Sequence, residues 1–277
     1  MPAIARERLD ELLAAAGLSS SFFSAREARV AEALRIAPVG QVVGESATRL
    51  SYGVVRATGP GAGGRRVPGE PRWLEQTGLV ASWSGARRRA AARLQAQAKI
   101  LSADAVVGVV VSRTRKAWAD TAVAHVRMLG TAVRLPGASE CSPDSAVPVV
   151  ALSLQDMLKL NAAGASPVAL VGGCAAVAAL PGRDTRRLLR WQARSRPAAE
   201  LTDFTFAFQQ ARRLAVGRLG DEARSAGAKG VVGITLDDVQ ATRAGGGDYE
   251  VVVHVVGTAI APAPARQGAP SVVSGLR

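Results

Sequence analysis

The residues able to bind a transition metal are few in this sequence. There are two histidines and two cysteines, His125, His254, Cys141 and Cys174, and the cysteines lack a CxxC spacing. A transition-metal site needs three or four clustered cysteine, histidine or carboxylate ligands. The two halves of the chain align with each other, yet they share none of these four residues. We therefore predict no metal and no cofactor, ordinary strand histidines and a buried Cys174 thiol.

Two other kinds of chemistry have weak signals. Gly59, Gly61 and Gly64 fit the GxGxxG spacing of dinucleotide-binding loops, which must open directly into a helix. The prolines of the following RRVPGEPRW forbid that helix, so we predict a loop. Nucleophilic catalysis needs a serine or cysteine, a histidine and an acid together. Neither histidine lies near a GxSxG motif and no carboxylate pair recurs, so the sequence favours a protein that is not an enzyme.

Arginine supplies most of a net charge of +13, since lysine accounts for only four of the 35 basic residues. Residues 21–135 contain 18 basic and 7 acidic residues, against 13 and 10 in residues 150–262. The candidate anion or interface patch comprises Arg87, Arg88, Arg89, Arg93, Arg186, Arg187 and Arg190. Such clusters can bind an anionic ligand or nucleic acid with strong salt dependence. We favour the alternative of a solvated helix face or an arginine-rich subunit interface.

The chain contains one domain-sized pattern twice. A shift of 125 residues aligns ARRRAAARLQAQAKILSADAVVGV, from Ala86, with ARRLAVGRLGDEARSAGAKGVVGI and gives 11 identities in 24 positions. Upstream, the segment from Ser24 aligns with the segment from Ser153, and downstream GTAV aligns with GTAI. The GTA motifs place His254 opposite Arg127. Signals that recur in one order at this period indicate duplication of a whole domain.

Each copy predicts a short helix, a strand and a long helix in that order. Ser24 and Ser153 are the expected N-caps of the short helices, which end before a proline. The first strands are expected around residues 39–44 and 168–173. The long helices are expected to begin at Thr77 and Thr202, with the threonine hydroxyls capping the first turn. Their apolar faces are predicted to contain Ala91, Leu94, Ala98 and Leu101, matched by Val216, Leu219, Ala223 and Ala226.

Two more strands follow each long helix. AVVGVVV and GVVGITL are β-branched runs typical of buried strands, and we expect Gly108 and Gly233 in them to allow close approach. The last strands, AVAHVRMLGTAV and YEVVVHVVGTAI, follow a loop, and AGGGDY predicts a hairpin turn. The predicted fold class is α+β: two tandem two-layer domains, each an antiparallel sheet packed by one long helix, with a short helix before the first strand.

Composition places the expected boundaries. We predict an N-terminal helix at residues 1–20, domains at 21–135 and 150–262, a linker at 136–149 rich in proline and serine, and a disordered tail at 263–277. SPVALVGGCAAVAAL is too short for a membrane span and is interpreted as a buried strand. With no export signal and few cysteines, the expected location is the cytoplasm.

The pattern AR..A..RL...A...GA.GVVG, followed by a strand ending in GTA, resembles the YbjQ-like domains, a family labelled as heavy-metal-binding. Both copies match, over residues 21–135 and 150–262. The resemblance implies a small domain with a helix on an antiparallel sheet, which assembles into rings that include pentamers and has no established reaction. We therefore expect a non-enzymatic protein that forms a ring or stacked homo-oligomer through strand edges and long helices. The alternatives are a basic module for anions or nucleic acid, and the metal binding of the family label.

Overall fold

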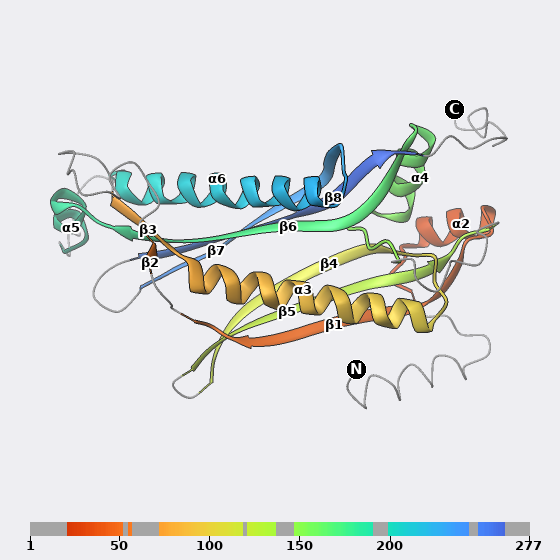
Figure 1. Cartoon of the computed structure of the whole chain (residues 1–277), viewed down its shortest axis with the longest axis horizontal. Helices are drawn as coiled ribbons and strands as arrows, with labels where there is room; N and C mark the ends of the chain where they lie inside the picture. Colours follow the sequence, from red (N-terminus) through yellow and green to blue (C-terminus); the bar gives the residue numbers. More distant parts are fainter. Residues whose placement is uncertain are drawn as a thin grey trace.

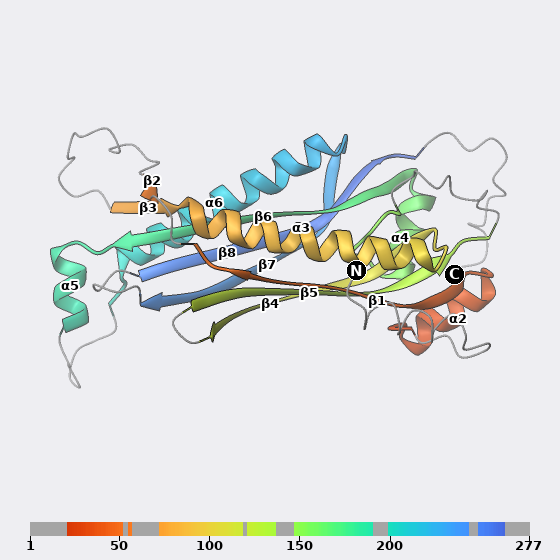
Figure 2. The ribbon, with the colours of Figure 1, turned by 60° about the horizontal axis from the view of Figure 1, so that its bottom comes forward.

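The chain folds into four layers, in the order helix, sheet, helix, sheet (Figure 1). The computed structural model describes residues 21–51, 55–56, 72–118, 121–136, 147–190, 199–243 and 249–263. We call the three-stranded sheet, in the order β1-β5-β4, sheet A, and the five-stranded sheet, in the order β2-β3-β6-β8-β7, sheet B. Helix α6 covers one face of sheet B, and α3 lies between sheet B and sheet A (Figure 2).

Sheet A comes from the first half of the chain and sheet B mainly from the second. The strands of sheet A are β1 (Ala37–Arg49), β4 (Ala105–Trp118) and β5 (Thr121–Arg134). The matching strands of sheet B are β6 (Ala165–Leu180), β7 (Gly230–Arg243) and β8 (Tyr249–Pro262). All described pairs within the two sheets are antiparallel. The predicted fold class is therefore confirmed, including SPVALVGGCAAVAAL as the strand β6.

Three described elements were not predicted. The first half of the chain also contributes β2 (Val55–Arg56) and β3 (Arg72–Gln76), and β3 pairs with the edge of β6 in sheet B. A short helix, α5 (Arg183–Arg190), follows β6 at one end of the molecule. These pieces lie in the segments where the two copies differ in sequence, so the repeat gave no signal for them.

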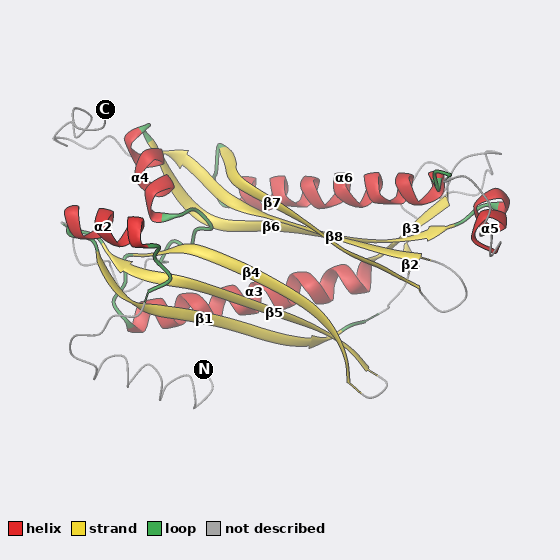
Figure 3. Cartoon of the chain, turned by 180° about the vertical axis from the view of Figure 1, so that it is seen from behind, coloured by secondary structure: helices red, strands yellow, loops and turns green. Residues whose placement is uncertain are grey.

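The short helices agree with the sequence analysis. Helix α2 (Ala25–Ala33) has Ser24 as its N-cap, in a capping box with Glu27. Helix α4 (Leu154–Ala162) has Ser153 as its N-cap. The two helices lie side by side at one end of the molecule (Figure 3), where the Leu154 amide donates a hydrogen bond to Glu27.

The long helices begin where expected, although the expected caps are wrong. Helices α3 (Thr77–Ile100) and α6 (Thr202–Ser225) have Gln76 and Leu201 as N-caps, and neither cap residue makes a side-chain capping bond. Each threonine is already the first helical residue, one position too late to cap. Buried residues, most of them alanine, repeat every four positions and let each helix lie close to its own sheet. They are Ala86, Ala90, Leu94 and Ala98 in α3, and Ala207, Ala211, Ala215, Leu219 and Ala223 in α6.

The predicted apolar face is thus partly wrong. Leu94, Ala98, Leu219 and Ala223 are buried, as is Leu101 just after α3. Ala91 and Ala226 are only half-buried, and Val216 is 48% exposed. Residues four positions apart form one ridge on a helix surface. The predicted face used steps of three, four and three residues, so it combined members of two neighbouring ridges, and only one of these ridges faces the helix's own sheet.

The glycines that allow close approach lie on the first strands. Gly108 and Gly233 have positive φ angles, +65° and +60°, at β-bulges, and a Cβ at Gly108 would meet no atom within 4 Å. The expected close approach is therefore wrong for Gly108, which is needed for its backbone conformation. At Gly44 and Gly173 an added Cβ would lie 1.9 Å from the carbonyl oxygen of a helix residue, Ala90 or Ala215.

Several predictions lie outside the described residues. These are the helix at 1–20, the GPGAGG loop, Cys141 with most of the linker, the AGGGDY turn except Tyr249, and the tail beyond Ala263. Among the helices that are described, none has the length and apolar character needed to span a membrane.

Candidate functional site

The seam between the two halves brings together charged side chains from both. Helix α3 faces sheet B with Trp83 and Arg87, and Arg87 donates hydrogen bonds to Glu222 of α6 and to the carbonyl oxygen of Gly172. Strand β4 contributes Arg113, which pairs with Asp237 of β7. Its neighbour on the same face, Arg115, pairs at 2.6 Å with the buried carboxylate of Glu250. The side chains of Arg113 and Glu250 are buried, so removing the partner of either would leave a buried charge uncompensated, which favours one relative position of the two halves.

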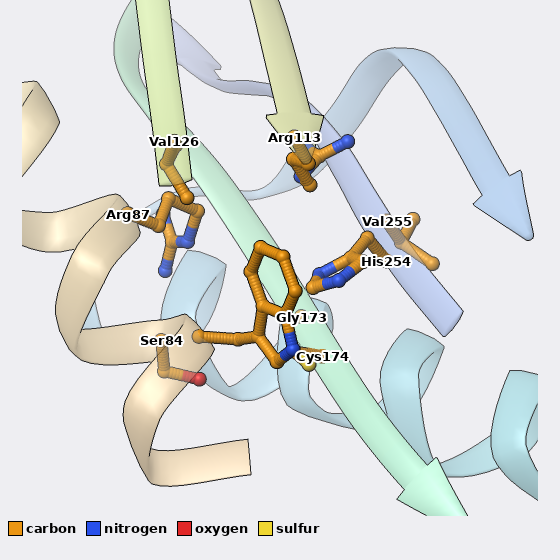
Figure 4. Close-up of a pocket in the computed structure, with 9 residues that line it drawn as sticks. Ser84, Arg87, Arg113, Val126, Gly173, Cys174, His254 and Val255 are labelled. Carbon is orange, nitrogen blue, oxygen red and sulfur yellow. The ribbon is translucent and has the colours of Figure 1, made fainter. Parts of the chain in front are cut away.

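A small cavity lies in the middle of this seam (Figure 4). Its walls come from α3, both sheets and both copies of the repeat: Trp83, Ser84, Arg87, Arg113, Val126, Gly173, Cys174, His254 and Val255. The cavity volume of about 10 Å³ is at the lower limit for one water molecule. It is far below the several hundred Å³ of typical small-molecule sites, so this cavity does not bind an organic substrate or cofactor.

Cys174 and His254 are direct cross-strand partners on the face of sheet B that α3 covers. Both are buried, and the imidazole of His254 meets the indole of Trp83 edge-on, with ring centroids 4.8 Å apart. Burial raises the pKa of the Cys174 thiol to about 12, against a weaker opposing effect of nearby arginines. Burial, with the charges of Arg113 and Arg87, lowers the pKa of His254 to about 3. The site therefore contains a protonated thiol and a neutral imidazole at neutral pH.

This pair alone has too few donors for a metal site. Cysteine and histidine are the correct donor types for a soft metal, but two donors fall short of the three or four that a site needs. The described residues contain no group of three histidine, cysteine or acidic residues suited to a metal ion. The thiol would also have to lose its proton in a buried place, and the two flanking guanidinium groups would repel a cation.

The seam also contains two buried polar atoms without hydrogen-bond partners, His254 Nε2 and Arg113 Nη2. The side chain of Arg113 is only 4% exposed, and burial lowers its pKa in spite of the nearby Asp237 carboxylate. A buried polar atom without a hydrogen-bond partner lowers the free energy of unfolding, because it has lost its hydrogen bonds to water. The site is thus electropositive and small, which suits a structural junction better than a reaction centre.

The predicted arginines do not form a common patch. Arg87 points into the seam, whereas Arg88 is exposed. Arg89 donates to the hydroxyls of Ser46 and Thr48, and Arg93 donates to the carbonyl oxygen of Glu45. Thus three of the four arginines of α3 bind groups of the protein itself.

The second arginine group lies elsewhere. Arg186 and Arg187 are exposed on α5, at the end of the molecule (Figure 1), and Arg190 is the last residue of that helix. The structure therefore separates this group from the arginines of α3. Anion or nucleic-acid binding by these residues stays a prediction, and the geometry adds no support for it.

Sequence reasoning missed the pairing of Cys174 with His254 and the role of Arg113. Counting back from the GTA motif gives His254 and Arg127 the same place on their sheets, and the first strands align Cys174 with Glu45. The structure keeps both pairs, since Glu45 is the cross-strand partner of Arg127. The equivalence of the Cys174–His254 pair and the Glu45–Arg127 pair could therefore be predicted from the sequence, but the burial of Cys174 and His254 could not.

We expect Cys174 to be nearly unreactive in the folded protein. In a Cys141→Ser variant, which leaves Cys174 as the single thiol, alkylation at pH 8 should be about a hundredfold slower or more than in denaturant, because the thiolate is the reacting species. The measurement is the rate of iodoacetamide incorporation by mass spectrometry. Similar rates in the folded and unfolded protein would contradict the buried, protonated thiol.

Comparison with known proteins gives two findings. The model of the YbjQ_1 family, described as "Putative heavy-metal-binding", matches residues 74–136 and 168–262. The chain is also similar to the "Encapsulin nanocompartment protein Rv1762c" of Mycobacterium tuberculosis (strain ATCC 25618 / H37Rv), with 37% identity over 153 residues. That alignment covers 54% of this chain and 56% of the relative, so the chain spans about half the length of the relative it matches.

Proposed function

This chain belongs to the YbjQ_1 family, and we propose that it is a non-catalytic protein that assembles with copies of itself into a ring or a stack. The relative named for a nanocompartment supports assembly as the common property. The small size of the cavity at the seam supports a role without catalysis, since this cavity has no room for a substrate. We take residues 21–135 and 150–262 as the two assembly units. We assign the protein to the cytoplasm, where the free Cys174 stays reduced.

The observation that carries this proposal is the unequal cover of the two sheets. Sheet B has α6 on one face and α3 with β4 on the other. Sheet A has α3 on one face, and its other face contains exposed residues such as Glu45, Thr114 and Arg127. Val110 of the same sheet is 65% exposed. A β-branched sheet with an edge strand, and with a face that no helix of the described residues covers, invites a neighbouring subunit.

We expect the purified protein to have a mass of several times 28.5 kDa, which is the mass of one chain. The test is light scattering coupled to gel filtration, at micromolar concentration and without a histidine tag. Oligomers should persist in moderate salt, because apolar contacts and strand pairing are screened little. A strict monomer across the concentration range would overturn the proposed function.

A further inference from the structure

Helix α3 packs on two sheets through two neighbouring ridges. The first ridge, Ala86 to Ala98, faces sheet A. The second ridge contains Leu79, Trp83, Arg87 and Ala91, four residues apart. Trp83, 2% exposed, meets the ring of His254 edge-on, and Arg87 binds the Gly172 carbonyl oxygen, so this ridge covers the outer face of sheet B. One helix therefore joins its own sheet to the next sheet of the repeat.

Helix α6 has the same two ridges. Its first ridge is buried like the first ridge of α3, but its second ridge is less buried than the second ridge of α3. The shift of 125 residues aligns the second ridge of α3 with Phe204, Phe208, Arg212 and Val216. Arg212 and Val216 are exposed, and the two phenylalanines are only half-buried. In α3 the residues aligned with these phenylalanines, Leu79 and Trp83, are almost completely buried. The second ridge of α6 thus has the sequence of a sheet-covering ridge, and it belongs to a helix on the outside of the molecule (Figure 1). Its two phenylalanines pack in part against the core of their own half, whereas Arg212 and Val216 are exposed.

The outer face of sheet A is the matching surface. Its Glu45 and Arg127 occupy the places of Cys174 and His254, as cross-strand partners in the same register. The side chains of Glu45 and Arg127 are 49% and 48% exposed, and Arg127 Nε lies 4.0 Å from Glu45 Oε1. On sheet B, Trp83 meets His254 edge-on, and Arg87 lines the same small cavity as Cys174. A second α6 in the same position brings Arg212 to the carboxylate of Glu45 and Phe208 over the guanidinium of Arg127, and both contacts are favourable.

The edge of sheet A offers the same strand pairing as the edge of sheet B. In the seam, β3 precedes α3 and pairs with β6, with Glu75 opposite Val177. The residue aligned with Glu75 is Glu200, directly before α6, and the residue aligned with Val177 is Thr48 of β1. Strand β1 is an edge strand of sheet A. A short segment before a second α6 can therefore extend sheet A as β3 extends sheet B.

We infer that a second copy of this chain docks its α6 on the outer face of sheet A, with residues 199–201 beside β1, in the way that α3 and β3 dock on sheet B. The second copy's Arg212 then contacts Glu45, and its Phe208 contacts Arg127. This contact is heterologous, because different surfaces of the two copies meet, so it closes into a ring or continues as a stack. The inference rests on the proposed self-assembly and assigns the surfaces that produce it.

The test uses charge reversal in the full chain. Glu45→Arg and Arg212→Glu each place like charges at the junction, and each should raise the concentration for half-assembly about tenfold or more. An equimolar mixture of the two variants should regain assembly. When the two variants alternate, the arginine that replaces Glu45 faces the glutamate that replaces Arg212, and at the next junction the unchanged Glu45 faces the unchanged Arg212. The matched control is Arg213→Glu, an exposed arginine one residue along α6 that lies off the second ridge, which should assemble like the wild type.

The readouts separate the two hypotheses. Mass is measured by light scattering over a dilution series, and folding of each variant is checked by circular dichroism. If the wild type is a monomer, the proposed function fails. If the wild type assembles and folded Glu45→Arg and Arg212→Glu keep its mass, or their mixture gains nothing over the single variants, the assigned surfaces are wrong while the proposed function stands.

Discussion

Replacing Gly173 by alanine should cost about 3 kcal/mol or more of unfolding free energy, because the new methyl group has no space. A Cβ at this position would lie 1.9 Å from the carbonyl oxygen of Ala215 in α6. That oxygen belongs to the helix backbone and cannot rotate away, so the whole helix would have to move off sheet B. Such a shift would also disturb the Arg87 pair with Glu222, since Glu222 lies on the same helix. The measurement is urea unfolding at fixed protein concentration.

Gly217→Ala is the matched control for this substitution. Gly217 lies inside α6, and an added Cβ there would meet no atom within 4 Å. Alanine is favoured over glycine in a helix interior by about 1 kcal/mol, so this variant should be as stable as the wild type or more stable. Equal stability of the Gly173→Ala and Gly217→Ala variants would show that α6 does not lie as close to β6 as described.

His254 should make the folded protein sensitive to acid. Burial and the charges of Arg113 and Arg87 lower its pKa to about 3, whereas a histidine in the unfolded chain titrates near 6.5. Between these values the unfolded state binds the proton and the folded state does not, so the unfolding free energy falls as the pH falls through this window. At pH 4 the loss from this group should be about 3 kcal/mol. The measurement is the urea midpoint from pH 7 to pH 4.

His254→Phe is the variant that isolates this effect. It retains an aromatic ring beside Trp83 and removes the titration, and the Nε2 atom that it deletes has no hydrogen-bond partner. Its stability should fall less steeply with acid than that of the wild type. Burial raises the pKa of Glu250, which acts in the opposite sense, so the two proteins must be compared at each pH. Parallel pH curves for the two proteins would contradict a buried neutral imidazole.

The candidate site was only partly predictable. Alignment of the GTA motifs gave His254 and Arg127 equivalent places, and in the structure their cross-strand partners are Cys174 and Glu45. The arginine cluster of α3 was seen in the sequence, but its members point in different directions because neighbouring positions on a helix face different sides. Arg87 enters the seam, while Arg89 and Arg93 bind groups of sheet A. Nothing in the spacing of charges distinguished these roles.

The sequence alone determined the elements that the two halves share, and their duplication. Serine caps, prolines, β-branched runs and helical spacing act over a few residues, and these local signals placed the short helices, the long helices and the paired strands. The repeat then predicted one architecture for both halves, since similar sequences bury similar faces.

Only the tertiary structure decided which faces meet. Both sheets have an outer face and both long helices have a second ridge, so the order of the elements does not say which ridge covers which face. Docking of α3 on sheet B buries Cys174 and His254, whereas the equivalent Glu45 and Arg127 stay half exposed. The reason is that contacts between halves join residues more than a hundred positions apart, and no local periodicity records them.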